Sequence, residues 1–324
     1  MEESVKLLFV DDEQSILNCL KRLFMDDNFE ILTCTDGHSA LEMLKCNNIA
    51  VIISDNFMPG MKGIELLQRA KMISPDSVRI ILTGHVDFQS AVDAINRGEV
   101  YKFVTKPWDN KKLRTIVLQS VERHRIVQSL RKADEYSLYS LAQTIELKDP
   151  YTKGHCERVA GYATSIAEAM GLDEVLRENI RRGSWLHDCG KIGVPEAILN
   201  HPGPLGVDEM GVIKKHPCWG ADVARLAHLS ETVVKIILHH HERFDGQGYP
   251  LGLAGEDIPL EARIVHVADI YDALTSDRSY RARTTKEKAI EILLAGKGVC
   301  SDPKIVDIFL ALLGGPDEGN NGEI

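Results

Sequence analysis

Histidine and aspartate residues gather at two places in the second half of the chain. An adjacent pair, His187-Asp188, is followed three residues later by Lys191, and three consecutive histidines occupy residues 239–241. An adjacent His-Asp pair can give one metal ion an imidazole while its carboxylate bridges to a second ion. Two-metal sites use such bridges to hold the ions roughly 3.5 to 4 Å apart and to act on a phosphoester. The pattern therefore predicts a metal-dependent phosphohydrolase.

Further short motifs surround these histidines in a definite order. They are Asp149-Pro-Tyr-Thr-Lys-Gly-His155, Pro202-Gly203-Pro204-Leu205, His216-Pro217, His240-His241-Glu242 with Asp245-Gly246-x-Gly248-Tyr249-Pro250, and Ala268-Asp269-Ile-Tyr-Asp272 with Asp277-Arg278-Ser-Tyr-Arg281. No single motif suffices, but their order and spacing make chance a poor explanation. Residues 139–315 therefore resemble an HD-GYP domain, the family of cyclic di-GMP phosphodiesterases, which implies an all-α domain of the HD superfamily.

The resemblance implies a centre of two metal ions. It assigns one ion to His155, His187, Asp188 and Asp269, and the other to Asp188, His216, His240 and His241. Because the donors are imidazole and carboxylate without thiolate, Fe, Mn, Ni and Zn all suit them. In the three-metal version of the family a glutamate precedes the first histidine by four residues, and Tyr151 stands at that position here. Two divalent ions per chain are expected.

The resemblance also assigns catalytic and substrate-binding roles. Metal coordination lowers the pKa of water enough to supply a nucleophile near neutral pH. With Asp188 as the bridge, Lys191 would help to neutralise the non-bridging phosphate oxygens. Asp272 would protonate the leaving oxygen or orient water, and Tyr249 would contact the substrate. These are the catalytic and substrate-binding candidates of the central motifs.

Two arginines complete the predicted substrate site. Arg278 and Arg281 are three residues apart, so that on a helix they face the same way and can grip a phosphodiester. The alternative is that they form ordinary surface ion pairs. A lone histidine is likewise most often a core or surface residue, and this interpretation applies to His38, His124, His201, His228 and His239.

Length and composition bound the other possibilities. A chain of 324 residues with 44 % hydrophobic residues suggests two globular domains. The net charge of -10 argues against DNA binding. Seven cysteines without a C-x-x-C spacing, and no signal peptide or long apolar run, predict a reduced cytoplasmic protein without a membrane segment.

The first half alternates short apolar runs with longer amphipathic segments. This pattern predicts a doubly wound α/β fold, with parallel strands near residues 6–10, 29–33, 51–54, 78–82 and 101–104. Chemistry in such sheets collects at the carboxyl ends of the strands. Four of those ends carry Asp11-Asp12, Asp55, Thr83 and Lys106, which should therefore converge.

This constellation is similar to the flavodoxin-like receiver domain of response regulators, over residues 1–122. The resemblance makes Asp55 the phosphoacceptor, with Asp11, Asp12 and Asp55 binding Mg²⁺ through hard oxygen ligands. Lys106 would pair with the phosphoryl oxygens, while Thr83 and Phe103 would rearrange on phosphorylation. A sensor histidine kinase is the implied partner.

A helical connector is predicted between the two domains. No glycine or proline occurs between Pro107 and Pro150, which allows one helix or two joined end to end. The predicted linker covers residues 123–138, and residues 316–324 are expected to form a flexible tail. The apolar stripe on the connector suits either a solvated helix or a dimerising signalling coil that would make the protein a homodimer.

Three functional hypotheses follow. The first is a phosphorylation-regulated response regulator that hydrolyses cyclic di-GMP to pGpG or GMP. The second is a phosphohydrolase on another nucleotide, and the third is a weakly catalytic interaction module. The complete ligand set argues against the third. The family resemblance adds docking of diguanylate cyclase domains near residues 248–250.

Overall fold

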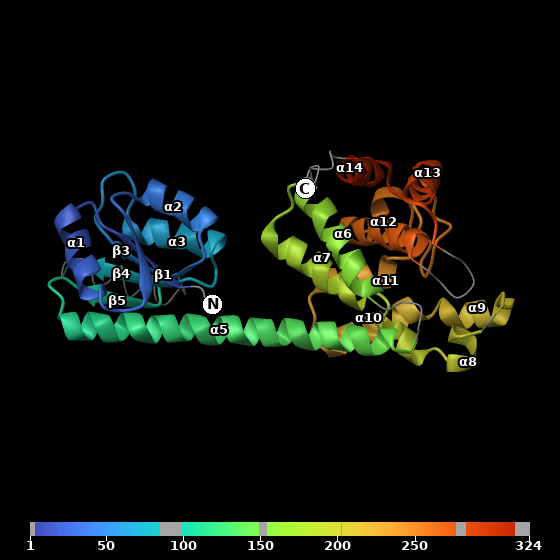
Figure 1. Ribbon diagram of the computed structural model, residues 1–324, viewed down its shortest axis with the longest axis horizontal. Helices are drawn as coiled ribbons and strands as arrows, with labels where there is room; N and C mark the ends of the chain where they lie inside the picture. Colours follow the sequence, from blue (N-terminus) through green and yellow to red (C-terminus); the bar gives the residue numbers. More distant parts are fainter. Residues whose placement is uncertain (1–3, 85–98, 149–153, 202, 277–282, 315–324) are drawn as a thin grey trace, which may run out of the picture. The chain divides into compact units, whose positions relative to one another are not determined.

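The computed structural model describes residues 4–84, 99–148, 154–201, 203–276 and 283–314. The chain divides into two compact units, Met1–Ala133 and Asp134–Ile324. The first unit contains a parallel sheet with helices on both faces, and the second is built from helices (Figure 1). The predicted α/β fold followed by a helical fold is confirmed.

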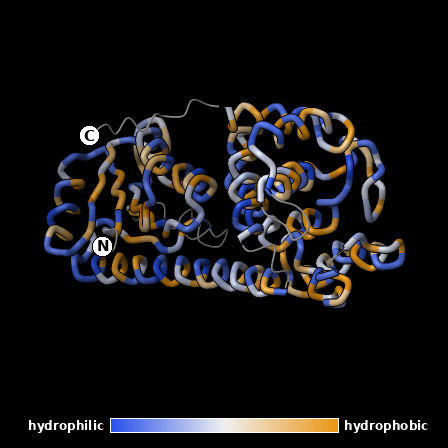
Figure 2. The backbone as a smooth tube through the Cα atoms, turned by 45° about the vertical axis from the view of Figure 1, so that its right-hand side comes forward, coloured by the Kyte–Doolittle hydropathy of each residue, from blue (hydrophilic) through white to orange (hydrophobic). Residues whose placement is uncertain are grey.

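Five parallel strands form the sheet of the first unit in the order β2-β1-β3-β4-β5. They are β1 (Val5–Val10), β2 (Phe29–Cys34), β3 (Ile49–Asp55), β4 (Val78–Thr83) and β5 (Lys102–Thr105). All five predicted strands are present, and their ends differ from the predicted ends by one or two residues at most. The short apolar runs of the sequence form these strands, and hydrophobic residues are orange in Figure 2.

Helices cover both faces of this sheet because successive strand side chains point to opposite sides. Leu7 and Phe9 of β1 join the core with α1 (Gln14–Leu23) and the first turns of α5. Leu8 and Val10 join the core with α2 (Gly37–Cys46) and α3 (Gly63–Ile73). Fully burying each such side chain contributes about 1.5–3 kcal/mol. The two cores fix the strand register and thereby the polar carboxyl edge of the sheet.

The predicted connector lies inside one helix, α5 (Asn110–Glu146), of 37 residues. Leu113 and Val117 pack in the core of the first unit. Near the other end of α5, Tyr139 and Ala142 pack in a core of the second unit. Of the two possibilities that the sequence left open, the structure contains the single helix.

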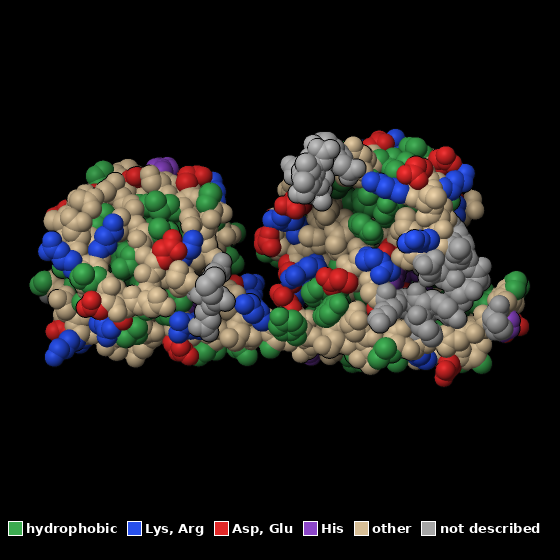
Figure 3. Space-filling view, viewed as in Figure 1, with side chains coloured by type: hydrophobic (Ala, Val, Ile, Leu, Met, Phe, Trp, Pro, Cys, Tyr) green, Lys and Arg blue, Asp and Glu red, His purple; other side chains and the backbone are tan. Residues whose placement is uncertain are grey.

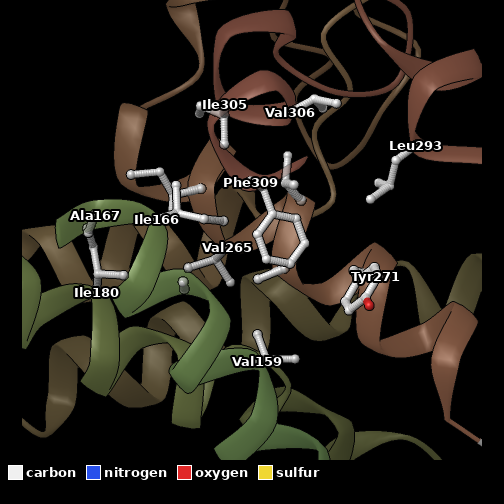
Figure 4. Close-up of a cluster of buried hydrophobic side chains, with 14 of the residues drawn as sticks. Val159, Ile166, Ala167, Ile180, Val265, Tyr271, Leu293, Ile305, Val306 and Phe309 are labelled. Carbon is white, nitrogen blue, oxygen red and sulfur yellow. The ribbon is translucent and has the colours of Figure 1, made fainter. Parts of the chain in front are cut away.

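Within the described residues, the second unit contains the remaining helices. They are α6 (His155–Ala169), α7 (Glu174–Leu186), η2 (Cys189–Gly193), α8 (Glu196–Leu199), α9 (Val207–Ile213), α10 (His216–Leu226), α11 (Glu231–His239), η3 (Gly255–Asp257), α12 (Leu260–Thr275), α13 (Lys286–Gly296) and α14 (Pro303–Leu313). Val159, Ile166, Val265 and Phe309 belong to a core that joins α6, α12 and α14 (Figure 4). This core fixes the helices that carry the first and last candidate ligands.

The surface carries charges of both signs. On the face drawn in Figure 3, Lys and Arg side chains are interspersed with Asp and Glu. None of the helices in the described ranges combines the length and the hydropathy that crossing a bilayer requires.

Candidate functional site

The carboxyl edge of the sheet in the first unit gathers most of the predicted receiver residues. Asp11 directly follows β1, Asp55 ends β3 and Thr83 ends β4. Lys106 follows β5, and its Nζ forms ion pairs with Asp11 Oδ2 at 2.8 Å and with Asp55 Oδ1. Both aspartates are buried, and a buried charge requires a partner. The structure thus brings Asp11, Asp55 and Lys106 together.

The other receiver candidates lie beside this group. The backbone N–H of Lys106 donates to the carbonyl oxygen of Thr83 at 2.8 Å, which pairs the ends of β4 and β5. Asp12 is exposed next to buried Asp11. Phe103 is partly buried in β5 and packs against the core formed with α2 and α3. The carboxylates at this edge are hard oxygen ligands of the kind that Mg²⁺ prefers.

The metal-ligand candidates of the second unit lie mostly at helix ends. His155 begins α6, His216 begins α10, His187 and Asp188 follow α7, His240 and His241 follow α11, and Asp269 lies within α12. Ligands from five separate segments can converge only after these helices have packed together. The cores described above therefore determine the geometry of the site.

The ligand atoms form two clusters, in each of which all atoms lie within 4.8 Å of one another. The first contains His155, His187 and Asp188, and the second contains Asp188, His216, His240 and His241. Asp269 lies next to the first cluster, with its Oδ1 3.3 Å from His155 Nε2. The structure brings together all seven residues that the sequence analysis named, and Asp188 belongs to both clusters.

Hydrogen bonds of the Nδ1 atoms, which point away from the clusters, orient the buried imidazoles. Nδ1 of His187, His216 and His240 each lies 2.7–2.8 Å from a backbone carbonyl oxygen. A carbonyl oxygen only accepts hydrogen bonds, so each Nδ1 carries the hydrogen and each Nε2 keeps a lone pair. Such contacts fix the tautomer of metal-binding histidines.

The Nε2 atoms, on the other side of each ring, then face one another within the clusters. Nε2 of His216 lies 3.3 Å from Nε2 of His240. His155 and His187 show the same 3.3 Å separation between their Nε2 atoms. The Nε2 lone pairs of His216 and His240 cannot hydrogen-bond to each other, whereas a cation between them would satisfy both. The donor set of each cluster therefore fits a metal ion.

The electrostatic environment is consistent with this fit. Burial lowers the pKa of His240, and it lowers the pKa of His241 to about 3, so both imidazoles remain neutral as metal ligands require. Burial also opposes a charge on His155. Hydrogen bonds to Asp269 and Asp272 outweigh that effect and raise the pKa of His155 to about 9. This part of the site favours a positive charge.

Asp272 lies behind His155, on the Nδ1 side of its ring. Its Oδ2 is 2.7 Å from His155 Nδ1, and its Oδ1 accepts a hydrogen bond from Arg158 Nε at 2.6 Å. Burial alone would raise the pKa of Asp272, but these two partners outweigh it and lower the pKa. A carboxyl group with a lowered pKa is a poor proton donor. The geometry therefore favours orientation of His155 over protonation of a leaving group.

Two lysines and a tyrosine flank the clusters. Lys191 Nζ lies 2.6 Å from Asp188 Oδ2. The Tyr249 ring packs against His241, with centroids 4.7 Å apart and an interplanar angle of 31°. Lys214 Nζ lies 5.4 Å from the centroid of the Tyr249 ring. Lys214 was not predicted as a site residue, and no spacing rule would have selected it.

A buried glutamate holds the loop that carries Tyr249. The carboxylate of Glu242 accepts the backbone N–H of Leu251 at 2.7 Å and of Leu253 at 3.1 Å. Within the loop, a Cβ atom on Gly248 would lie 2.3 Å from the backbone nitrogen of Arg243, closer than packed atoms approach. The predicted role of this glycine in loop geometry thus has a steric cause.

Two stretches of backbone, one around Gly190 and one at the start of α10, are in close contact next to the second cluster. A Cβ atom on Gly190 would lie 1.9 Å from the carbonyl oxygen of His216 and 2.6 Å from the nitrogen of Gly220. The segment that follows Asp188 is therefore in direct backbone contact with the start of α10. This contact sets the separation between Asp188 and His216.

Some predicted residues lie outside the described residues, namely Arg278, Arg281 and Tyr151. His239 belongs to neither cluster found in the described part of the chain, and its Nδ1 lies 3.8 Å from Glu242 Oε1.

Comparison with known proteins defines the class. Residues 140–305 match the family model of the HD domain, and residues 7–118 match that of the response regulator receiver domain. The chain belongs to the HD domain family and is a response regulator with a receiver domain.

Its relatives include two proteins that it matches over most of their length. It is 34% identical to the cyclic di-GMP phosphodiesterase response regulator RpfG of Xanthomonas campestris pv. campestris, over 94% of this chain and 87% of that protein. It is 30% identical to a cyclic di-GMP phosphodiesterase of Thermotoga maritima, over 94% of this chain and 90% of that protein. It is also 37% identical to the 3'3'-cGAMP-specific phosphodiesterase 2 of Vibrio cholerae, over 58% of this chain and 37% of that protein.

Proposed function

We propose that this protein is a cytoplasmic response regulator that hydrolyses cyclic di-GMP to pGpG or GMP under control of phosphorylation. The observation that carries the proposal is the pair of imidazole and carboxylate clusters that share Asp188. The similarity to two cyclic di-GMP phosphodiesterases over nearly the whole chain supports the choice of substrate.

Two divalent transition metals, drawn from Fe, Mn, Ni and Zn, fit these donors. One would be held by His155, His187, Asp188 and Asp269, and the other by Asp188, His216, His240 and His241. When bound, such ions supply an activated water and neutralise phosphoryl charge. The Nδ1 contacts of His187, His216 and His240 hold the Nε2 atoms of these three histidines in place.

The surrounding residues would bind and orient the phosphodiester. Lys191, next to the shared carboxylate, is placed to pair with a non-bridging oxygen. Tyr249 stacks on His241 and would form one wall of the substrate site. Asp272 would keep His155 in the required tautomer. Arg278 and Arg281 remain predicted contacts to the phosphodiester.

The receiver unit would control this activity. Asp55 would accept a phosphoryl group from a sensor histidine kinase, with Mg²⁺ held by Asp11, Asp12 and Asp55. Lys106 already pairs with two of these carboxylates and would pair with the phosphoryl oxygens. Docking of diguanylate cyclase domains and homodimer formation through α5 remain part of the proposal.

Hydrolysis assays with purified, metal-loaded protein test the proposed substrate. The full-length protein with added Mn²⁺ or Fe²⁺ is incubated with a panel of cyclic dinucleotides, and the products are separated by chromatography. Turnover of cyclic di-GMP in preference to the others is expected. Absence of turnover for every substrate, in protein with two bound ions, would favour an interaction module.

A second candidate substrate has one specific observation in its favour. The chain is similar, over 58% of its length, to a 3'3'-cGAMP-specific phosphodiesterase. Preferential turnover of 3'3'-cGAMP in the same panel would replace the first candidate and leave the metal centre unchanged.

A further inference from the structure

The last turn of α5 holds the first turn of α6, which begins at His155. Glu146 is only 6% exposed, and its carboxylate accepts the backbone N–H of Gly154 at 2.8 Å and of Cys156 at 2.7 Å. The N-cap residue of α6 is Gly154, so α6 has no side-chain cap of its own. The first N–H groups of a helix lack partners within it and favour a negative charge. Glu146 supplies this cap from another helix.

Two residues further on, Lys148 holds the segment that follows Lys191. Its Nζ donates to the carbonyl oxygen of Ile192 at 2.7 Å and of Val194 at 2.6 Å. These carbonyls lie at the end of η2, whose N-cap residue is Asp188. Glu146 at the end of α5 and Lys148 just beyond it are thus tied to the two segments that bring ligands to the first cluster.

A small cavity shows how close these groups are. It has a volume of about 10 Å³, and its lining includes Glu146, His155, Asp188 and Lys191. A space of this size holds about one water molecule at most. The end of α5 and the candidate ligands therefore form the wall of the same cavity, with almost nothing between them.

We propose that the end of α5, together with Lys148 just beyond it, is a positioning element of the metal centre. Glu146 sets the place of His155, and Lys148 sets the place of Asp188 and Lys191. Both residues act through the ligands and contact no substrate. The inference rests on the proposed function only in taking the two clusters as a metal centre. It also gives α5 a direct mechanical role in the site, beyond that of a linker.

Metal titration of full-length variants tests the role of Glu146. Glu146→Ala and Glu146→Gln are compared with Glu168→Gln, which changes a 71% exposed acid on the same helix as His155. Mn²⁺ affinity and stoichiometry are measured by equilibrium dialysis, which is informative even if the protein hydrolyses no cyclic di-GMP. Glu146→Ala should weaken one of the two ions about 10- to 100-fold, the range for lost contacts behind a ligand. Glu146→Gln keeps one acceptor oxygen and should weaken it less.

Two outcomes would overturn the role of Glu146. Wild-type affinity for both ions in Glu146→Ala would show that the contact positions nothing. An equal loss of both ions together with a lower melting temperature in both Glu146 variants would indicate a general folding role. Loss of one ion in a protein with a normal circular dichroism spectrum is the expected result.

A lysine variant tests the second half of the proposal independently. Lys148→Met should weaken both ions, because Asp188 is shared between the clusters. Its control is Lys132→Met, at an exposed lysine of α5, which should bind Mn²⁺ as the wild type does. Unchanged affinity in Lys148→Met would overturn the role assigned to Lys148.

Discussion

Asp188 is the one residue that contributes ligand atoms to both clusters. Its Oδ1 lies 3.3 Å from His216 Nε2, while its Oδ2 lies 3.5 Å from His187 Nε2. No neighbouring carboxylate among the described residues occupies the same position. Both halves of the centre therefore depend on this side chain.

Replacement of Asp188 should abolish metal binding and activity together. Asp188→Ala removes the shared ligand, so bound metal and hydrolysis should both fall to near background. Metal analysis and a hydrolysis assay measure the two quantities, and Asp222→Ala, at an exposed aspartate on α10, serves as the control. Near-normal hydrolysis with unchanged metal content would refute the two-metal interpretation.

Asp272→Asn separates a positioning role from a role as general acid. A positioning carboxylate behind a histidine ligand typically contributes about 10- to 100-fold to metal affinity or activity. The variant should therefore bind metal more weakly, while its pH–rate profile keeps the shape of the wild-type profile. If Asp272 were the proton donor, the alkaline limb of the pH–rate profile would disappear in the variant.

The sequence pointed to the candidate ligands but not to the residues that support them. The family motifs mark each of the seven ligand candidates, and the structure places all seven close together. Arg158, in contrast, supports Asp272 from 114 positions away in the chain. Glu242 binds backbone N–H groups, which leave no trace in residue types. Such partners are defined by the packed fold, so sequence patterns alone could not identify them.

At the scale of elements, the loop after α11 depends on the absence of a side chain at Gly248. Gly248→Ala would place a methyl group 2.3 Å from the nitrogen of Arg243 and 2.5 Å from Cα of Glu242. We expect destabilisation by about 1–3 kcal/mol, the usual cost of overpacking. Because Tyr249 would shift, activity should fall while both ions remain bound.

The control for this loop variant is Gly211→Ala in α9, where a Cβ atom would meet nothing within 4 Å. Thermal unfolding and hydrolysis should both be near wild type in the control. A Gly248→Ala protein that matches the control in both measurements would show that the loop accommodates a side chain.

Periodicity predicted the strands and the absence of helix breakers predicted the connector. The strands could be predicted because each is a short apolar run, and in β3 every residue is buried. The sequence could not choose between one connector helix and two, since any run without glycine or proline allows both. Packing of both ends of α5 into cores, through Val117 and Ala142, accompanies the single helix that is observed.

At the scale of the whole molecule, we expect two divalent ions per chain in the helical unit. The two clusters account for both ions, and the sequence has Tyr151 where a third-metal ligand would stand. Metal analysis and native mass spectrometry of anaerobically purified protein measure the count. Three well-occupied ions bound by the helical unit would show that another residue supplies the missing ligand.

Phosphorylation of the receiver should change the activity of the helical unit. It adds nearly two negative charges at Asp55, where Lys106 now forms its ion pairs. Couplings between sites are typically about 1–3 kcal/mol, or roughly 5- to 150-fold. Beryllofluoride should therefore change the hydrolysis rate or the dimer fraction several-fold in the native protein and leave Asp55→Asn unaffected. Identical rates and association with the mimic bound would assign the receiver to localisation or partner choice.

The contact of Gly190 with the start of α10 bears on how this centre can evolve. Helices that pack through side chains shift when a buried side chain is replaced by one of different volume, and the ligands on these helices shift with them. Between Asp188 and His216 the contact is made by backbone atoms, which are the same whatever residues surround them. Neutral substitutions elsewhere in the unit can accumulate without altering this spacing. Position 190 itself is the exception, because any side chain there would force the two stretches of backbone apart and change the separation of the ligands.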